Sequence, residues 1–202
     1  MGFRIIISFS AFLIITSCVQ KSPKIDQAKS ITMASTKDIQ PTDLKMIMML
    51  VDKIDKEINS CVAETVSYSD GGDGTGIRYK NDKSVVKISC DEMYDALNES
   101  LQYYFKDNEL VYIAKRRGQG VDCYSADSCP GGSEYEQLRL YISAGKIFHI
   151  EKRYQLCKDD SKCPPLDSLL FHDVTDSVDA KKLLQDETVS MNNIISHFEN
   201  KQ

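Results

Sequence analysis

The sequence predicts an α+β domain in which an N-terminal amphipathic helix packs on an antiparallel meander of about six strands, followed by a C-terminal helical region. Three observations support this prediction. An apolar stripe with helical spacing precedes the strands, a β-hairpin pattern occurs three times in succession, and helical spacing resumes after two adjacent prolines. We assign this single domain, stapled by disulfides, to residues 41–202.

The first helix is expected at about residues 42–62. Apolar residues recur there in steps of three and four, which places them on one face of a helix. They are Leu44, Ile47, Met48, Val51, Ile54, Ile58 and Val62. Thr42 or Asp43 can cap this helix, because a side-chain oxygen at that position accepts a hydrogen bond from a free backbone N–H of the first turn.

A hairpin pattern occurs at residues 77–89, 102–114 and 139–151. Each copy has an aromatic or aliphatic strand, a short turn and an alternating apolar strand. The turn centres, which suit tight hairpins, are Asn81-Asp82, Asp107-Asn108 and Ala144-Gly145. Alternation after each turn predicts that one sheet face receives Val86, Ile88, Val111, Ile113, Phe148 and Ile150. The opposite face is expected to receive Lys87, Tyr112 and His149.

Two further segments flank the hairpins. The run DGGDGTG at residues 70–76 combines aspartates with glycines, as an EF-hand calcium loop does. Such a loop needs oxygen ligands at its third and fifth positions. Glycines stand at both positions, so we expect a flexible connection into the first hairpin instead. Beyond Pro164-Pro165 we expect a helical region, broken near residues 188–190, that packs on the same sheet face as the first helix or covers an edge strand.

Residues 1–17 have the composition of an export signal. Arg4 provides a short positive region, and the uncharged, mostly apolar residues 5–15 follow. A transmembrane helix needs about 20 apolar residues, so this shorter stretch predicts a signal peptide. It ends in ITSC at residues 15–18, which resembles the lipobox of bacterial lipoprotein precursors. A plain cleaved signal followed by an unrelated cysteine is the alternative.

The resemblance to lipoprotein precursors implies that Cys18 gains a diacylglycerol by a thioether bond and becomes the acylated N-terminus. Several acyl chains anchor a protein far more strongly than one, so a membrane is the first expected partner. The polar residues 18–40 then form a flexible tether in the cell envelope. Val19 is not the aspartate that retains some Gram-negative lipoproteins in the inner membrane, which favours the outer membrane.

The six cysteines after Cys18 are expected to form disulfides, because an even number in an exported protein indicates a disulfide framework. The expected pairs are Cys123 with Cys129, Cys157 with Cys163, and Cys61 with Cys90. The first two pairs each enclose five residues, which closes a small loop easily, and the third follows by elimination. A zinc site is the alternative, but no C-x-x-C or nearby histidine pair supports it.

Charge and motifs exclude several function classes. The net charge is −5 and there is no basic stripe, so nucleic acid is not an expected partner. The sequence predicts no catalytic residue, metal or cofactor, because the histidines are scattered and no nucleophile motif is present. His149 lies two positions before Glu151 and could serve acid–base chemistry. An exposed sheet face commonly carries such pairs, which is the interpretation we favour.

Because hairpins reverse the chain, the glycine-rich residues 118–135 and the ring 157–163 should emerge together, opposite the tight turns. Loops carry function more often than the scaffold does, so the sequence predicts a non-enzymatic module that binds a protein or glycan there. An inhibitor of an extracytoplasmic enzyme and an envelope hydrolase are the alternatives. The hydrolase would require Glu134, Glu151 or His149 together in a pocket. Residues 42–155 resemble secreted bacterial lipoproteins with tandem hairpins, which implies no catalytic residues.

Overall fold

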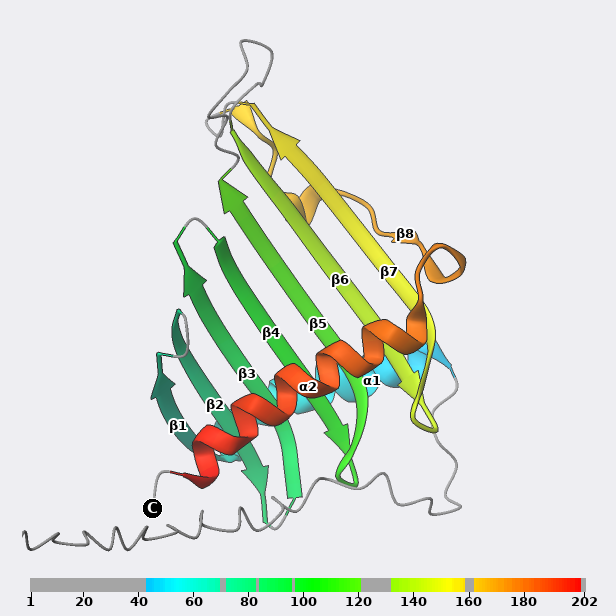
Figure 1. The fold of residues 1–202 in the computed structure, drawn as a ribbon. Coiled ribbons are helices and arrows are strands. Elements are labelled where there is room, and N and C mark those ends of the chain that lie inside the picture. Colours follow the sequence, from blue (N-terminus) through cyan, green and yellow to red (C-terminus); the bar gives the residue numbers. More distant parts are fainter. Residues whose placement is uncertain are drawn as a thin grey trace, which may run out of the picture.

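One antiparallel sheet of eight strands, with a helix on each side, forms the centre of the computed structural model (Figure 1). Each strand pairs with the next one in the sequence, from β1 to β8. The structure describes residues 43–69, 72–82, 84–95, 97–120, 132–158 and 162–200. The predicted α+β class and antiparallel meander are confirmed, with eight strands rather than six.

The helices and strands follow one another without long insertions among the described residues. They are α1 (Leu44–Glu57), η1 (Ile58–Ser60), β1 (Val62–Tyr68), β2 (Asp73–Asn81), β3 (Ser84–Tyr94), β4 (Leu97–Lys106), β5 (Glu109–Gly120), β6 (Ser133–Ser143), β7 (Lys146–Cys157), η3 (Leu166–Ser168), β8 (His172–Asp173), η4 (Thr175–Ser177) and α2 (Ala180–Glu199). The strands that the sequence analysis missed are β1 and the short β8 at the two sheet edges.

The glycine-rich run before the first predicted hairpin is strand rather than a flexible connection from Asp73 onward. Its glycines make room for neighbouring groups. A side chain at Gly74 would collide with the ring of Tyr68, and one at Gly76 would crowd Phe198 of α2. The glycines therefore serve close packing within β2. Composition alone does not distinguish this role from flexibility.

Helix α1 begins as predicted, because the side chain of Asp43 accepts a hydrogen bond of 2.9 Å from the Lys45 backbone N–H. It ends at Glu57, earlier than the predicted residue 62. The Ser60 hydroxyl donates to the Glu57 carbonyl at 2.6 Å, which satisfies a terminal carbonyl of the helix. Val62 then opens β1 with 65% of its surface exposed, so it does not extend the apolar stripe.

Helix α2 is continuous from Ala180 to Glu199, so the break expected near residues 188–190 does not occur. The Thr188 hydroxyl donates to the Leu184 carbonyl at 2.7 Å, a bond that a threonine can make without leaving the helix. Figure 1 shows α2 crossing the sheet face opposite to α1, so each helix covers its own face. Among the described residues, neither helix has the length and apolarity to span a membrane.

The two helices cover separate apolar cores. The core under α2 includes Ile88, Tyr103, Ile113, Leu140, Ile150, Met191, Ile194 and Phe198. The core under α1 comprises Ile47, Val51, Ile54, Tyr104, Val111, Tyr112 and Tyr141. Burial of both faces explains how a meander with two exposed edges forms a stable layer.

A β-bulge occurs at the same place in all three predicted hairpins. In β4–β5, Tyr104 pairs with Tyr112 and Phe105 pairs with Leu110, so Val111 has no partner. The equivalent unpaired residues in β3 and β7 are Val86 and Phe148. A bulge sets two residues of one strand against one residue of the other and interrupts the alternation of side chains.

The bulges correct the predicted assignment of side chains to faces. Three apolar residues pack on the α2 side, namely Ile88, Ile113 and Ile150. The bulge residues pack on the α1 side instead, and they are Val86, Val111 and Phe148. The expectation that both sets share one face was wrong, because each bulge adds one residue to the strand between its turn and its core isoleucine.

Two of the three predicted turn centres, Asp107-Asn108 and Ala144-Gly145, are confirmed. The third, Asn81-Asp82, is wrong by one residue, because Asn81 is the last residue of β2 and pairs with Ser84. Asp107 and Asn108 have φ angles of +53° and +64°, and Ala144 and Gly145 have +48° and +69°. Positive φ at both central residues is typical of the type I′ turn, whose twist matches that of the flanking strands. Asp82 also has a positive φ, of +43°, in the first hairpin.

Candidate functional site

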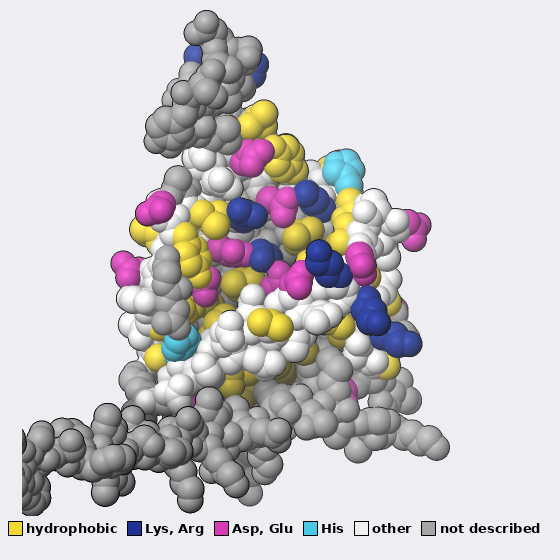
Figure 2. Space-filling view, viewed as in Figure 1, with side chains coloured by type: hydrophobic (Ala, Val, Ile, Leu, Met, Phe, Trp, Pro, Cys, Tyr) yellow, Lys and Arg dark blue, Asp and Glu magenta, His cyan; other side chains and the backbone are white. Residues whose placement is uncertain are grey.

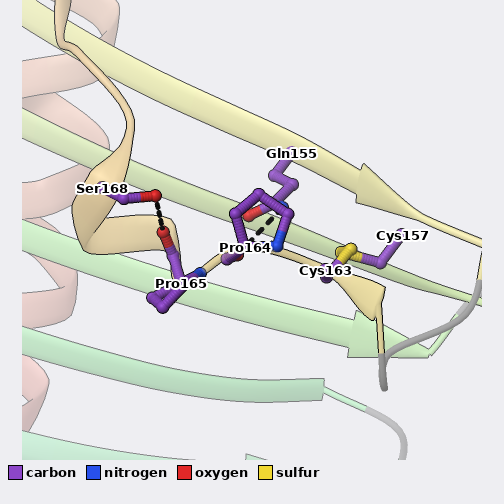
Figure 3. Close-up of a disulfide and its surroundings, with 6 residues drawn as sticks. All are labelled: Gln155, Cys157, Cys163, Pro164, Pro165 and Ser168. Carbon is purple, nitrogen blue, oxygen red and sulfur yellow. Dashed lines mark hydrogen bonds between the residues drawn. A yellow bond between two sulfur atoms is a disulfide. The ribbon is translucent and has the colours of Figure 1, made fainter.

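A disulfide joins Cys157 and Cys163 at the end of β7, as predicted, with 5.8 Å between their Cα atoms (Figure 3). Cys157 pairs across the sheet with Ser133, the first residue of β6. The ring therefore lies at the end of the sheet opposite the tight turns, where β5 also ends. We call this end the loop end. The predicted sites at Cys18, Cys123 and Cys129 lie outside the described residues.

The disulfide expected between Cys61 and Cys90 is not formed. Cys61 precedes the first residue of β1, whereas Cys90 lies opposite Gly76, which in turn lies opposite Val66. The two cysteines are thus two strands and five positions apart, which is beyond the reach of a disulfide. Pairing by elimination was wrong because it ignored this register.

Cys90 is a buried thiol in the core under α2, with 1% of its surface exposed. Its sulfur lies 2.6 Å from the hydroxyl oxygen of Tyr68, which also donates to Glu92. Burial raises the pKa of Cys90 to about 12. Since the thiolate is the reactive form of cysteine, this residue has a packing role rather than a nucleophilic one.

A groove of about 720 Å³ lies at the loop end, lined by residues of β1 to β6 and by the adjoining residue Ser69. Its floor is on the α1 side of the sheet, beyond the helix. Asp91 follows Lys87 by four positions, and Lys87 contacts Asp55 of α1. Arg116 likewise follows Tyr112, a member of the core under α1, by four positions. Side chains separated by an even number of positions share a face where the strand is regular.

Two adjacent rows of side chains form this floor, because the strand register places them directly opposite one another. The first row runs from β2 to β5 through Thr75, Asp91, Ser100 and Arg116. The second row runs from β2 to β6 through Asp73, Met93, Asn98, Gly118 and Tyr135. Neighbouring strands are about 4.8 Å apart, so a ligand that crosses the strands meets a new side chain at each step.

Several polar side chains of the floor are not engaged by the protein itself. Within the described part of the chain, no hydrogen bond or ion pair is made by the side chains of Thr75, Asp91, Asn98 or Ser100. Asp73 accepts a hydrogen bond of 2.9 Å from Ser69. The floor therefore offers both donors and acceptors to a ligand.

Tyr135 provides an aromatic surface in the groove. Its ring lies against Gly118, the residue directly opposite on β5, and a Cβ atom added there would be 3.2 Å from two ring atoms. The absence of a side chain at Gly118 thus lets the tyrosine lie close to the sheet. Tyr135 is half-buried, and it lines the groove.

The chain after the disulfide forms a wall beside the groove. Arg153 is buried, donates to the Leu169 carbonyl at 3.3 Å, and pairs with Asp167. Arg116 of the groove floor lies 3.9 Å from Asp167. A smaller cavity of about 260 Å³ shares Arg116 and Tyr135 with the groove and reaches the cysteine ring. The ring therefore borders the groove.

The histidine and carboxylates considered for hydrolysis are not assembled in one pocket. His149 lies 3.6 Å from Glu151 and 3.5 Å from Asp173. Glu134 is on the other sheet face and accepts a hydrogen bond from Tyr154 at 2.7 Å. Within the described ranges, no group of three metal-binding side chains is present.

The sheet face on the α2 side is highly charged, and its charges pair with one another. Figure 2 shows basic and acidic side chains interspersed on the sheet beside α2. Lys152 lies 2.5 Å from Glu136, and Lys115 pairs with both Glu99 and Glu187. These ion pairs link neighbouring strands to each other and β5 to α2.

No family model, curated protein or solved structure matches the chain. The function is therefore inferred from the groove. Gly118 and Tyr135 belong to the segment 118–135 that was predicted to bind a partner. The other floor residues were not predicted, because they are far apart in the sequence and form no motif. The floor residues share one signal in the sequence, a similar number of positions between each of them and the nearest hairpin turn. This signal can be used only when the strand register and the bulges are known.

Proposed function

We propose that this chain is a lipid-anchored protein of the cell envelope whose domain binds a partner in the loop-end groove. The lipid is carried by Cys18, and residues 18–40 form the tether. In a Gram-negative host, Val19 favours the outer membrane as its location. The observation that supports binding is that four polar side chains on the floor of an open groove of about 720 Å³ have no partner among the described residues.

The groove is built on rigid elements. Its floor consists of paired strands, and the smaller cavity beside it is lined by the Cys157–Cys163 disulfide, which closes a short loop. The Gln155 amide also donates to the Pro164 carbonyl at 3.0 Å and ties the ring to β7. A preformed surface loses little conformational entropy when a partner binds, which favours binding over a purely structural role.

The start of the domain lies away from the groove, which supports this arrangement. Near the N-terminal end of α1, Met48 accepts a hydrogen bond of 3.6 Å from Tyr141. Tyr141 is close to the turn between β6 and β7, at the opposite end of the sheet from the groove. A tether that ends at α1 would therefore leave the loop end accessible.

Affinity capture from detergent-solubilised envelope tests the binding surface. Asp91→Arg and Ser100→Arg place large cations on the groove floor and should abolish capture of the partner. Asp186→Arg is the matched control, because it makes the same change on the exposed face of α2. If both groove variants fold and still capture every partner of the wild type, the groove is not the binding surface.

The lipid anchor is tested separately. Cys18→Ala should prevent lipid attachment, so the precursor should accumulate with its signal uncleaved, and its size and its phase partitioning should differ from those of the wild type. Cys61→Ala, which alters a cysteine that forms no disulfide, is the control and should partition as the wild type does. Unchanged size and partitioning of the Cys18→Ala protein would overturn the lipid assignment.

A further inference from the structure

We propose that the ligand of the loop-end groove is an uncharged glycan chain that lies across the strands with one sugar ring against Tyr135. This inference rests on the proposed function, because it assigns a ligand class to the same groove. It is based on the chemistry of the floor side chains, on their charge and on the position of the aromatic ring.

The hydrogen-bonding groups of the floor match those of sugar hydroxyls. The hydroxyls of Thr75 and Ser100 and the amide of Asn98 can each donate and accept, and Asp91 accepts. These side chains have no partner within the described chain. A sugar hydroxyl also donates and accepts, so neighbouring hydroxyls of a glycan can satisfy neighbouring side chains of a row.

The charge of the floor disfavours an anionic ligand. Asp73 and Asp91 are both exposed on the groove side, and they would repel phosphate or carboxylate groups. The cation of the floor, Arg116, already lies 3.9 Å from Asp167. An uncharged ligand avoids this repulsion and can still donate hydrogen bonds to both carboxylates.

Large apolar side chains, which anchor most peptide ligands, are few among the described residues that line the groove. Among the described lining residues on the floor, Met93 and Tyr135 are the large side chains with apolar surface. Met93 is 60% exposed. Tyr135 lies against Gly118 and offers a broad apolar ring beside polar groups, a combination that suits the C–H face of a pyranose ring.

Titration calorimetry with the full-length protein in detergent tests this inference. The probes are cellohexaose, maltohexaose and the hexamer of N-acetylglucosamine, which are all uncharged but differ in linkage and substituents. We expect at least one to bind and its Kd to rise at least about tenfold in Tyr135→Ala and in Asp91→Ala. Tyr154→Ala removes an exposed tyrosine from the opposite sheet face and should leave the Kd unchanged.

Tyr135→Phe is the control that separates loss of the ring contact from a general loss of structure in Tyr135→Ala. It keeps the ring and removes the hydroxyl, so binding should stay within about twofold of the wild type if the ring makes the contact. Failure of all three hexaoses to bind, or binding that is unaffected by Tyr135→Ala and Asp91→Ala, would overturn the glycan assignment.

The two proposals fail in different ways. If envelope capture depends on Asp91 and Ser100 while none of the hexaoses binds, the groove is a binding surface for another kind of partner. The glycan inference then fails and the proposed function stands. If capture is also unaffected by the groove substitutions, both are wrong.

Discussion

The ammonium group of Lys115 on β5 lies 3.0 Å from the carboxylate of Glu187 on α2, and this ion pair joins the sheet to the C-terminal helix. Glu187 is 4% exposed, and Lys115 also pairs with Glu99 of β4. Burial by itself lowers the pKa of Lys115, but the carboxylates of Glu187 and Glu99 outweigh it and raise the pKa above 10.5. Helix α2 is thus attached to the sheet by this ion pair as well as by the apolar core beneath it.

Removal of the lysine should destabilise the fold. Lys115→Ala would leave the buried carboxylate of Glu187 and the partly buried carboxylate of Glu99 without a cation. Loss of one partner of a buried ion pair costs about 3–5 kcal/mol. Urea unfolding near pH 7 measures the loss. Lys182→Ala, on the exposed surface of α2, should change the unfolding free energy by less than about 0.5 kcal/mol. Equal stability of the two variants would show that the ion pair contributes nothing.

The same pair should contribute at all pH values up to the basic range. A group whose pKa is raised by folding stabilises the native state below its unfolded pKa, and this contribution disappears as the pH rises through the folded pKa. For Lys115 that loss begins only above the ordinary value of 10.5. The stability difference between the wild type and Lys115→Ala should therefore be constant from pH 6 to pH 9.

Glu92 should contribute to the acid sensitivity of the protein. Burial acts to raise its pKa, but hydrogen bonds from the Tyr94 and Tyr68 hydroxyls, each 2.7 Å long, outweigh burial and lower the pKa below 4.5. A carboxylate with a lowered pKa stabilises the fold above its unfolded pKa and loses this effect as the pH falls through the folded pKa. Glu92→Gln should therefore lose less stability than the wild type between pH 5 and pH 3.

Unfolding free energies measured at intervals over this range, with Asp186→Asn as the control, test the assignment. Asp186 is exposed on α2 and its side chain has no hydrogen-bond partner within the described ranges, so the control should follow the wild type. Parallel curves for the wild type and Glu92→Gln would mean that Glu92 is not a source of the acid sensitivity.

The turn between β6 and β7 offers a stabilising substitution. Ala144 adopts a φ of +48° in this turn, a conformation that alanine adopts only at a cost. Asparagine tolerates it, and Asn-Gly is a preferred pair for type I′ turns. Ala144→Asn should raise the unfolding free energy by about 0.5–1 kcal/mol. The neighbouring change Ser143→Asn, in the strand, should give no gain, and an equal gain from both would rule out the turn conformation as the cause.

Local features of this fold could be predicted from the sequence, whereas features that depend on register could not. The hairpin turns are local, because Asp107, Asn108 and Gly145 tolerate positive φ and leave a direct signal. The bulges leave no such signal. Val111 and Ile113 are both apolar, so the pattern is compatible with one shared face, and only the pairing of β4 with β5 shows that they separate.

The same distinction explains what was missed in β2 and in the groove. Gly74 belongs to a glycine-rich run that predicts a flexible segment, yet in the fold it makes room for the ring of Tyr68. Asp91, Ser100 and Arg116 are spaced nine and sixteen residues apart along the chain, and the sheet places them in one row. A candidate site of this kind becomes visible when strand register is available.

The state of the cysteines gives a direct test of that register. Without reduction, alkylation of the denatured protein should label Cys61 and Cys90, while Cys157 and Cys163 should react only after a reductant is added. In the native protein Cys61 should react much faster, because Cys90 is 1% exposed and its pKa is raised by burial. Peptide mapping by mass spectrometry assigns each label. A disulfide-linked peptide that contains Cys61 and Cys90 would contradict the pairing of β1, β2 and β3, since the two residues are too far apart in this sheet to bond.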